Sequence, residues 1–215
     1  MSLRFDTSDP SARTAGLEAA ASAARRGDLV VLPTDTVYGV GCDAFTPHGV
    51  AALLAAKGRG RDMPVPVLVG SPDTVEGLAY GLTKAARDLI EAFWPGALTV
   101  VVRHQPSLAW DLGDAAGTVA LRMPLHPVAI ELLRIVGPMG VSSANRSGSP
   151  AATTYAEAHD QLGDSVAVYL DAGTSGEAVP STIVDATGTV PRLLRLGALD
   201  LETLRSVCPD LAVEA

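Results

Sequence analysis

The chain has little cysteine, few aromatic residues and fewer basic than acidic residues. Its two cysteines, Cys42 and Cys208, are far apart without metal-ligand spacing, which favours two reduced thiols in a cytosolic protein over a disulfide framework. The net charge of −8 argues against a broad surface for nucleic acid or anionic membranes. The first residues lack a signal-peptide core, and no apolar run reaches the ~18 residues of a membrane span. We therefore expect a soluble, cytoplasmic protein.

Several common catalytic motifs are also absent. There is no G-x-x-x-x-G-K-[ST] phosphate loop, so an ATP site in this chain would be of another type. The histidines show no zinc-type spacing, and no G-x-S-x-G segment marks a serine nucleophile. Residues 39–44 fit a loose dinucleotide-binding pattern, but the glycines do not directly follow the predicted strand and Pro47 comes too early for the required helix. The sequence therefore predicts neither a protein nucleophile nor a metal cage.

Apolar segments along the chain indicate strands and helices that are mixed without strict alternation. Length and composition, 215 residues with 47% apolar and 19% charged, are typical of one globular domain. Predicted strands cover residues 29–32, 65–69, 97–102, 119–123, 139–141, 166–170, 182–184 and 190–194, and predicted helices cover 11–26, 50–56, 83–93, 127–136, 155–162 and a segment from about 199. We predict an α/β fold, a twisted mixed β-sheet with helices packed on it. It would form a single domain over residues 1–215, with a core of about 29–197 and a short C-terminal helix.

Three cations, Lys57, Arg59 and Arg61, alternate with the glycines Gly58 and Gly60. In an extended stretch their side chains would project from one side, and the glycines would let the backbone approach a ligand closely. A solvated basic turn would have the same composition. Phosphate binding becomes the better interpretation only when another polar segment joins the same site.

Such a segment, Ser142-Ser143-Ala144-Asn145, directly follows an apolar run. Ligands of open α/β sheets bind beyond the carboxyl ends of strands. Hydroxyls, an amide and free backbone N–H groups suit a phosphate or a carboxylate there, although a strand-ending turn would also be rich in serine and asparagine. Together the two segments predict a polyphosphate pocket.

A third segment, residues 33–41, reads PTDTVYGVG and follows a predicted strand. Its hydroxyls and carboxylate could bind a small zwitterion, and a capped turn is the alternative. Two arginines, Arg122 and Arg195, lie in apolar runs, where a cation must reach solvent or meet an anion. For each of them a surface ion pair is the alternative to a ligand contact.

Taken in order, these segments resemble the YrdC/TsaC family, the threonylcarbamoyl-AMP synthases. The matching pieces are PTDTVYGVG, KGR followed by P, FWPGALTVVV, VALRMPLHP, SSAN, STI and LLRLG, and they extend from residue 29 to about residue 197. Seven pieces in the family order are far more specific than any one alone. The family's catalytic Lys-Arg-Ser-Asn tetrad falls on Lys57, Arg59, Ser143 and Asn145. Departures from the family pattern stand at Gly60, Met63 and Leu68.

The resemblance implies a YrdC-like fold and an enzyme that converts L-threonine, bicarbonate and ATP into threonylcarbamoyl-AMP and pyrophosphate. The product would feed a transferase complex that makes threonylcarbamoyladenosine in tRNA. Mg²⁺ is the expected cofactor, bound mainly through ATP phosphates rather than by protein ligands. The resemblance places ATP on Lys57, Arg59, Thr118, Ser143, Asn145 and Arg195. It places L-threonine on Thr34, Thr36, Tyr38, Arg122, Ser142 and Ser181.

Other functions are compatible with the same basic cleft. One is a double-stranded-RNA-binding or ribosome-maturation factor, whose phosphate contacts would weaken steeply with salt. A carbamoyl-transfer module with another acceptor and a nucleotide-binding regulator without turnover are two more. Even for the enzyme, a weak contact with tRNA or double-stranded RNA remains open. Pyrophosphate release that depends on threonine separates the enzyme from all three.

Overall fold

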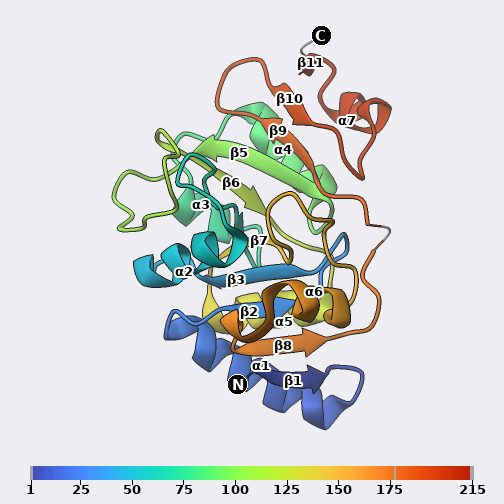
Figure 1. Ribbon diagram of the computed structural model, residues 1–215. Coiled ribbons are helices and arrows are strands. Elements are labelled where there is room, and N and C mark those ends of the chain that lie inside the picture. The colour runs from blue at the N-terminus through green and yellow to red at the C-terminus, as the bar shows by residue number, and fades with distance from the viewer. Residues whose placement is uncertain (1, 177, 214–215) are drawn as a thin grey trace.

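The computed structural model describes residues 2–176 and 178–213 and places helices around a twisted sheet (Figure 1). The strands are β1 (Leu3–Asp6), β2 (Val30–Leu32), β3 (Gly39–Asp43), β4 (Val67–Leu68), β5 (Leu98–Arg103), β6 (Thr118–Arg122), β7 (Met139–Ser143), β8 (Val168–Asp171), β9 (Thr182–Asp185), β10 (Arg192–Arg195) and β11 (Ala212–Val213). The helices are α1 (Pro10–Arg25), α2 (Pro47–Lys57), α3 (Thr74–Leu78), α4 (Lys84–Phe93), α5 (Pro127–Val136), α6 (Tyr155–Leu162), the 3₁₀ turn η1 (Gly163–Ser165) and α7 (Leu201–Val207). The predicted α/β class is confirmed.

Within the described residues, the strands form one sheet in the order β1-β8-β2-β3-β7-β4-β6-β5-β9-β10-β11. Parallel pairs such as β4–β6 and β5–β9 alternate with antiparallel pairs such as β3–β7 and β5–β6, so the sheet is mixed as predicted. The sequence did not predict the two edge strands, β1 and β11. Among the described residues, no helix is long and apolar enough to cross a membrane.

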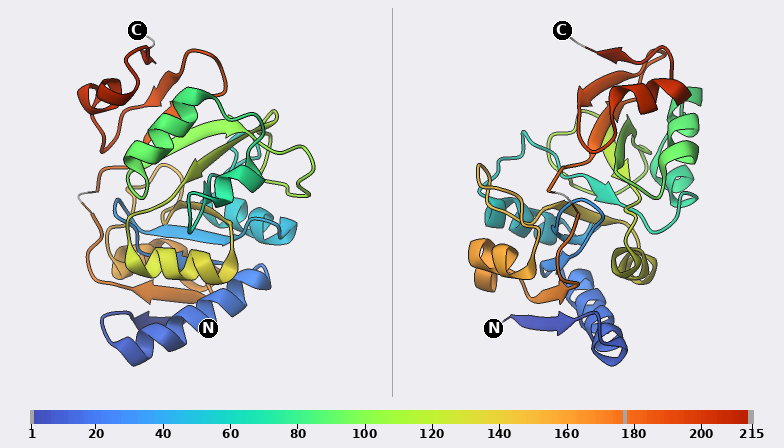
Figure 2. Two further views of the ribbon diagram at one scale, coloured as in Figure 1. Left: turned by 180° about the vertical axis from the view of Figure 1, so that it is seen from behind. Right: turned by 90° about the vertical axis from the view of Figure 1, so that its right-hand side faces the viewer.

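Two hydrophobic clusters hold the helices to the sheet. One joins α1 and α5 to β2 and β7 through residues such as Leu17, Leu132 and Val141, and Figure 2 (left) shows these two helices side by side on the face of the sheet that is turned toward the viewer. The other joins α2, α4 and α6 through residues such as Leu53 and Leu89. Burial of a leucine of this kind contributes about 1.5–3 kcal/mol. The helices therefore fix the strand ends from which the polar segments project.

The glycines of the PTDTVYGVG segment serve strand packing. A Cβ at Gly41 would lie 2.4 Å from the backbone oxygen of Gly140, and one at Gly39 would lie 2.7 Å from a methyl group of Val141. Only glycine allows β3 and β7 to pair this closely. The loose dinucleotide-binding pattern at residues 39–44 is thus explained by a strand pair.

The sheet is strongly coiled. Arg122 at the end of β6 and Met139 at the start of β7 pair with the same residue of β4, which lies between these two strands. Thr36 precedes Gly39, which pairs with Ser143 at the opposite end of β7. Arg122 nevertheless donates a hydrogen bond to Thr36. Twist between successive strands therefore brings two diagonal corners of the sheet together.

One face of β5, β6 and β9 is left partly open. Val119 and Leu121 of β6 point into the core, so Thr118, Ala120 and Arg122 share the opposite face. Ala120 and Thr118 are half-buried, as are Val101 of β5 and Ile183 of β9 on the neighbouring strands. The polar segments of the sequence converge toward this face.

Candidate active site

A chain of neighbouring cations runs through the site. Burial, and next the charge of Arg59, lowers the pKa of Lys57 to about 8. Burial, followed by the charge of Arg59, also lowers the pKa of Arg195. Burial lowers the pKa of Arg122. The charge of Asp35 raises this pKa in part, and the charge of Arg195 lowers it further. Cations that lie close enough to lower one another's pKa values repel one another, and this repulsion favours the binding of an anion between them.

Lys57 and Asn145 of the predicted tetrad meet inside the protein. The Lys57 ammonium is 2% exposed and donates to the backbone oxygen of Ser143, to that of Asn145 at 2.8 Å and to the Asn145 side-chain oxygen at 3.3 Å. The Asn145 amide donates to the backbone oxygens of Arg146 and Ser149, at 2.9 and 2.7 Å. Both side chains therefore shape the turn after β7, and Lys57 adds a buried positive charge beneath it.

Arg59 is the tetrad member with unused hydrogen-bonding capacity. Its Nη1 lies 3.5 Å from the Ser142 hydroxyl, and its Nε is buried without a partner among the described residues. A buried, unpaired guanidinium nitrogen is costly unless a ligand supplies the acceptor. Arg59 is therefore the strongest candidate for a direct anion contact.

The predicted projection of Lys57, Arg59 and Arg61 from one side is wrong. Lys57 is the last residue of α2, and Gly58 ends that helix in the left-handed region with φ 62°. Lys57 and Arg59 both reach residues 142–145, whereas Arg61 does not join them. Arg61 is exposed and forms salt bridges with Asp111, at 2.6 Å, and with Asp114, at 3.4 Å. Lys57 and Arg59 lie at the candidate site, whereas Arg61 stabilises the 104–117 loop through its two salt bridges.

The segment at residues 34–36 forms a rigid rim around Arg122. The guanidinium donates to the Asp35 carboxylate at 2.6 Å, the Thr36 hydroxyl at 3.0 Å and the Gly96 backbone oxygen at 2.9 Å. The Thr34 hydroxyl donates to the backbone oxygen of Val37 at 2.6 Å, which closes a local turn. Arg122 was predicted to meet a ligand carboxylate, and in the structure Asp35 already neutralises it. Asp35 supplies the carboxylate that the residue pattern of this segment offered to a zwitterion, and in the structure that carboxylate is paired with Arg122.

A third polar group lies at the start of β9. Arg195 donates through Nε and Nη2 to the Ser181 backbone oxygen, at 3.1 and 2.7 Å, and through Nη2 to the Ser181 hydroxyl at 3.2 Å. The Thr99 and Ser181 hydroxyls are 2.8 Å apart. The sequence predicted Arg195 and Ser181 but missed Thr99, because a threonine inside an apolar strand gives no functional signal on its own.

Two predicted contacts are placed differently from the rest. Tyr38 is fully buried and does not reach the open face, because its hydroxyl is bonded to the backbone at Ala172 and Gly173. Thr118 lies on the same face of β6 as Arg122, but its hydroxyl donates to Ala115 at 2.7 Å. Neither hydroxyl is free in this structure.

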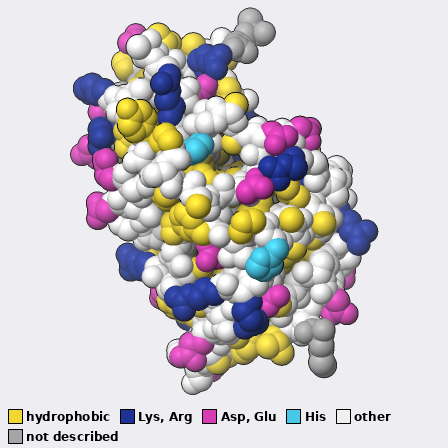
Figure 3. All heavy atoms as spheres, turned by 90° about the vertical axis from the view of Figure 1, so that its left-hand side faces the viewer, with side chains coloured by type: hydrophobic (Ala, Val, Ile, Leu, Met, Phe, Trp, Pro, Cys, Tyr) yellow, Lys and Arg dark blue, Asp and Glu magenta, His cyan; other side chains and the backbone are white. Residues whose placement is uncertain are grey.

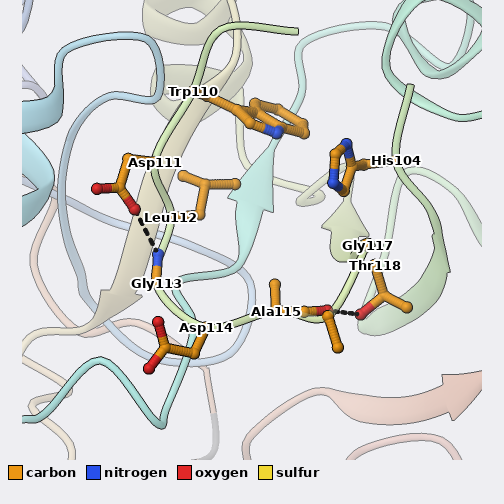
Figure 4. A pocket seen from close by; sticks show the side chains of 10 residues that line it. His104, Trp110, Asp111, Leu112, Gly113, Asp114, Ala115, Gly117 and Thr118 are labelled. Carbon is orange, nitrogen blue, oxygen red and sulfur yellow. Dashed lines mark hydrogen bonds between the residues drawn. The ribbon is translucent and has the colours of Figure 1, made fainter. Parts of the chain in front are cut away.

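Thr118 also lies at the rim of a pocket beside the 104–117 loop (Figure 4). The pocket has a volume of about 240 Å³, and His104 and Trp110 face it from the side opposite Asp114. Trp110 stacks on Phe45, with ring centroids 5.6 Å apart. The pocket is thus lined by two aromatic rings, and its two carboxylates are engaged by Arg61.

The surface shown in Figure 3 mixes both signs of charge. Basic and acidic side chains are interspersed around a central apolar area, and the side chains drawn there form no continuous basic surface. The cations of the site are the exception to the acidic average of the chain. The positive charge of the site is therefore a local feature of Lys57, Arg59, Arg195 and Arg122.

Comparison with known proteins identifies the family. The Sua5/YciO/YrdC family model, which is described as telomere recombination, matches residues 22–197. The chain belongs to the Sua5/YciO/YrdC family. This confirms the resemblance drawn from the seven sequence segments.

Relatives of the family cover the chain almost completely. A Mycobacterium tuberculosis protein provisionally named threonylcarbamoyl-AMP synthase is 62% identical over 207 residues, 96% of this chain and 95% of the relative. The Bacillus subtilis threonylcarbamoyl-AMP synthase is 34% identical over 98% of this chain and 60% of its own length. The crystal structure of Pyrococcus abyssi Sua5 with L-threonine matches with a TM-score of 0.87 and 31% identity, over 100% of this chain. This chain spans 62% of that Sua5 chain, so Sua5 has additional sequence.

Proposed function

We propose that this protein is a threonylcarbamoyl-AMP synthase, which forms threonylcarbamoyl-AMP and pyrophosphate from L-threonine, bicarbonate and ATP. The observation that carries the proposal is the chain of cations Lys57, Arg59, Arg195 and Arg122. Within it, Arg59 lies beside Ser142, and its Nε has no partner among the residues that the structure describes. The names of the relatives in the family support it.

The phosphate half of the proposed reaction needs positive charge more than it needs a nucleophile. The threonine amine and bicarbonate form a carbamate with release of water. A carbamate oxygen attacks the α-phosphorus of ATP, the bond from that phosphorus to the oxygen shared with the β-phosphate breaks, and pyrophosphate leaves. Negative charges meet in this step, so neutralising their repulsion is the protein's first task. Arg59 would contact the phosphates directly, and Arg195 would add a second guanidinium suited to bidentate contact. Lys57 would supply charge from beneath the Ser143–Asn145 turn that it holds.

The amino-acid half of the site would be the rim built by Arg122 and its partners. Asp35 and Thr36 offer a carboxylate and a hydroxyl next to the Arg122 guanidinium, which suits the ammonium and hydroxyl groups of threonine. The Ser181 hydroxyl lies across the open face, beside Thr99. The complex of the related Pyrococcus abyssi Sua5 with L-threonine supports an amino-acid subsite in this fold.

Mg²⁺ is proposed to enter with ATP. Among the described residues, no group of three His, Cys, Asp or Glu side chains could hold a metal, whereas the half-buried hydroxyl of Ser142 lies near Arg59. Those residues fit a metal carried on phosphate oxygens, which would neutralise charge on the triphosphate. The product, a reactive mixed anhydride, would pass to a tRNA-modifying transferase complex.

Pyrophosphate release tests the proposal directly. With ATP, Mg²⁺ and bicarbonate, we expect release to depend on L-threonine, to be much slower with L-serine and to stop when EDTA removes the metal. Excess Mg²⁺ should restore it. Threonine-independent release, or tight ATP binding without turnover, would contradict the proposed enzyme. RNA binding that falls steeply with salt would then favour the RNA-binding alternative.

The lowered pKa of Lys57 predicts a pH dependence of ATP use. Because the pKa is about 8 rather than 10.5, the free enzyme loses this charge as pH rises from 7 to 9. If the charge holds phosphates, kcat/KM for ATP should fall about tenfold over that interval. The measurement is a pH profile of kcat/KM, with Lys57→Arg as the comparison because an arginine stays charged. A flat wild-type profile would show that Lys57 acts only through its hydrogen bonds.

A further inference from the structure

Tyr38 lies in the core, and its hydroxyl forms hydrogen bonds with the backbone of the turn that follows β8. The hydroxyl accepts from the backbone N–H of Ala172 at 2.9 Å and donates to the backbone oxygen of Gly173 at 2.7 Å. Burial raises the pKa of this phenol to about 12, so it stays protonated and keeps both hydrogen bonds at physiological pH. The proposed reaction makes no chemical use of this group.

Asp171 fixes the same turn from the side of the N-terminal strand. Its Oδ1 accepts from the backbone N–H of Gly173 at 2.9 Å, and its Oδ2 accepts from Nε and Nη2 of Arg4 at 3.0 and 2.6 Å. Its backbone oxygen accepts from the N–H and hydroxyl of Thr7. The turn at residues 171–173 is therefore anchored, and Tyr38 ties it to the rest of the site.

The backbone of Tyr38 is bonded to the turn that carries the tetrad. Its carbonyl accepts from the N–H of Ala144, which lies between Ser143 and Asn145, at 2.8 Å, and its N–H donates to the carbonyl of Ala152 at 2.8 Å. One residue thus joins the phosphate half of the site to the segment at residues 171–176.

That segment continues directly onto the threonine rim. A Cβ at Gly176 would lie 2.1 Å from the Thr36 backbone oxygen and 2.8 Å from that of Asp35, and Gly176 has φ 51°. The neighbouring Ser175 N–H donates to the backbone oxygen of Thr153 at 2.8 Å. The backbone after β8 therefore presses on the same two residues that hold Arg122.

We propose that Tyr38 is a positioning residue: its hydroxyl holds residues 171–176 against the turn at residues 34–36 and so sets the shape of the amino-acid subsite. It acts without touching substrate. The effect on kinetics rests on the proposed function, whereas the effect on the backbone does not. Removing the hydroxyl leaves the N–H of Ala172 and the carbonyl of Gly173, in partly buried hydrogen bonds, without this partner, which loosens the segment.

Tyr38→Phe tests the proposal, and Tyr169→Phe is a matched control. Tyr169 is also fully buried in the same cluster and donates to one backbone oxygen, that of Gly163, at 2.8 Å. Both variants delete one buried hydroxyl and should lower the melting temperature. In Tyr38→Phe we expect KM for L-threonine to rise about tenfold, with kcat and KM for ATP within about twofold of wild type. In Tyr169→Phe all three constants should stay unchanged.

Hydrogen–deuterium exchange gives a second measurement that needs no turnover. In Tyr38→Phe, peptides covering residues 34–38 and 171–176 should exchange about tenfold faster, and in Tyr169→Phe they should match wild type. Equal exchange in the two variants would overturn the proposal, as would parallel changes in the constants for ATP and threonine. If the wild type releases no pyrophosphate with threonine, the proposed function fails, and exchange alone still decides the role of Tyr38.

Discussion

Replacing Arg59 with alanine is expected to lower kcat/KM for ATP by about a hundred- to a thousandfold, the usual effect of removing one preorganised transition-state donor. Arg59 is the cation whose Nε has no partner in the described structure, and it lies beside both Lys57 and Arg195. Because the side chain holds little of the protein together, its loss should not unfold the chain. Steady-state pyrophosphate release and a melting curve measure the two effects separately.

Arg61→Ala is the control for that experiment. Arg61 lies two residues further along, has the same charge and is exposed, and it pairs with Asp111 and Asp114 rather than with the site. We expect kcat/KM for ATP to change by less than about threefold, since exposed ion pairs contribute little. An equal loss in both variants would mean that the segment acts through its total charge. Near-normal turnover of Arg59→Ala would remove the main support for the proposed phosphate site.

Replacing Asp35 with alanine is expected to lower the free energy of unfolding by about 3–5 kcal/mol, because it leaves a buried guanidinium without its counter-charge. The Asp35 and Arg122 side chains are 16% and 8% exposed and 2.6 Å apart. Asp35 also accepts from the backbone N–H of Leu125 at 2.9 Å, so the same change frees a second donor. Urea unfolding with linear extrapolation gives the free energy.

Asp88→Ala provides the matched control on the surface. Asp88 pairs with Lys84 at a similar distance, 2.5 Å, but the lysine is 86% exposed and the two residues are one helical turn apart. We expect a loss of about 0.5 kcal/mol or less. If Asp35→Ala costs no more than Asp88→Ala, Arg122 finds other compensation, and the rim at residues 34–36 is not held together by its ion pair.

The approach of Lys57 to the Ser142–Asn145 segment could be predicted from sequence because both lie where regular elements end. Lys57 ends α2 and Ser143 ends β7, and both ends were visible in the apolar pattern. The hydrogen bonds that occupy the predicted residues could not be predicted. The side chains of Asn145 and Thr34 form hydrogen bonds with backbone groups of their own turns. The sequence alone does not distinguish an asparagine or threonine that stabilises a turn from one that binds a ligand.

The missed elements have a common physical cause. β1 and β11 are four and two residues long and exist through pairing with distant or terminal segments. A short edge strand has little apolar pattern to detect, since its stability comes from the partner strand. The departure of Arg61 from the other two cations was missed for another reason, because the helix end at the left-handed Gly58 means that residues 57–61 are not one extended stretch.

The coiled sheet has a consequence for how the protein is made. The hydrogen bonds of the site join residues far apart in the chain, 86 positions from Lys57 to Ser143 and 87 from Asp35 to Arg122, and Arg195 lies close to the C-terminal end of the chain. Chains with such distant contacts fold slowly, and during synthesis the N-terminal strands emerge long before their partners. A nascent chain that has not yet reached Arg195 therefore lacks one of the cations that we propose to hold the polyphosphate.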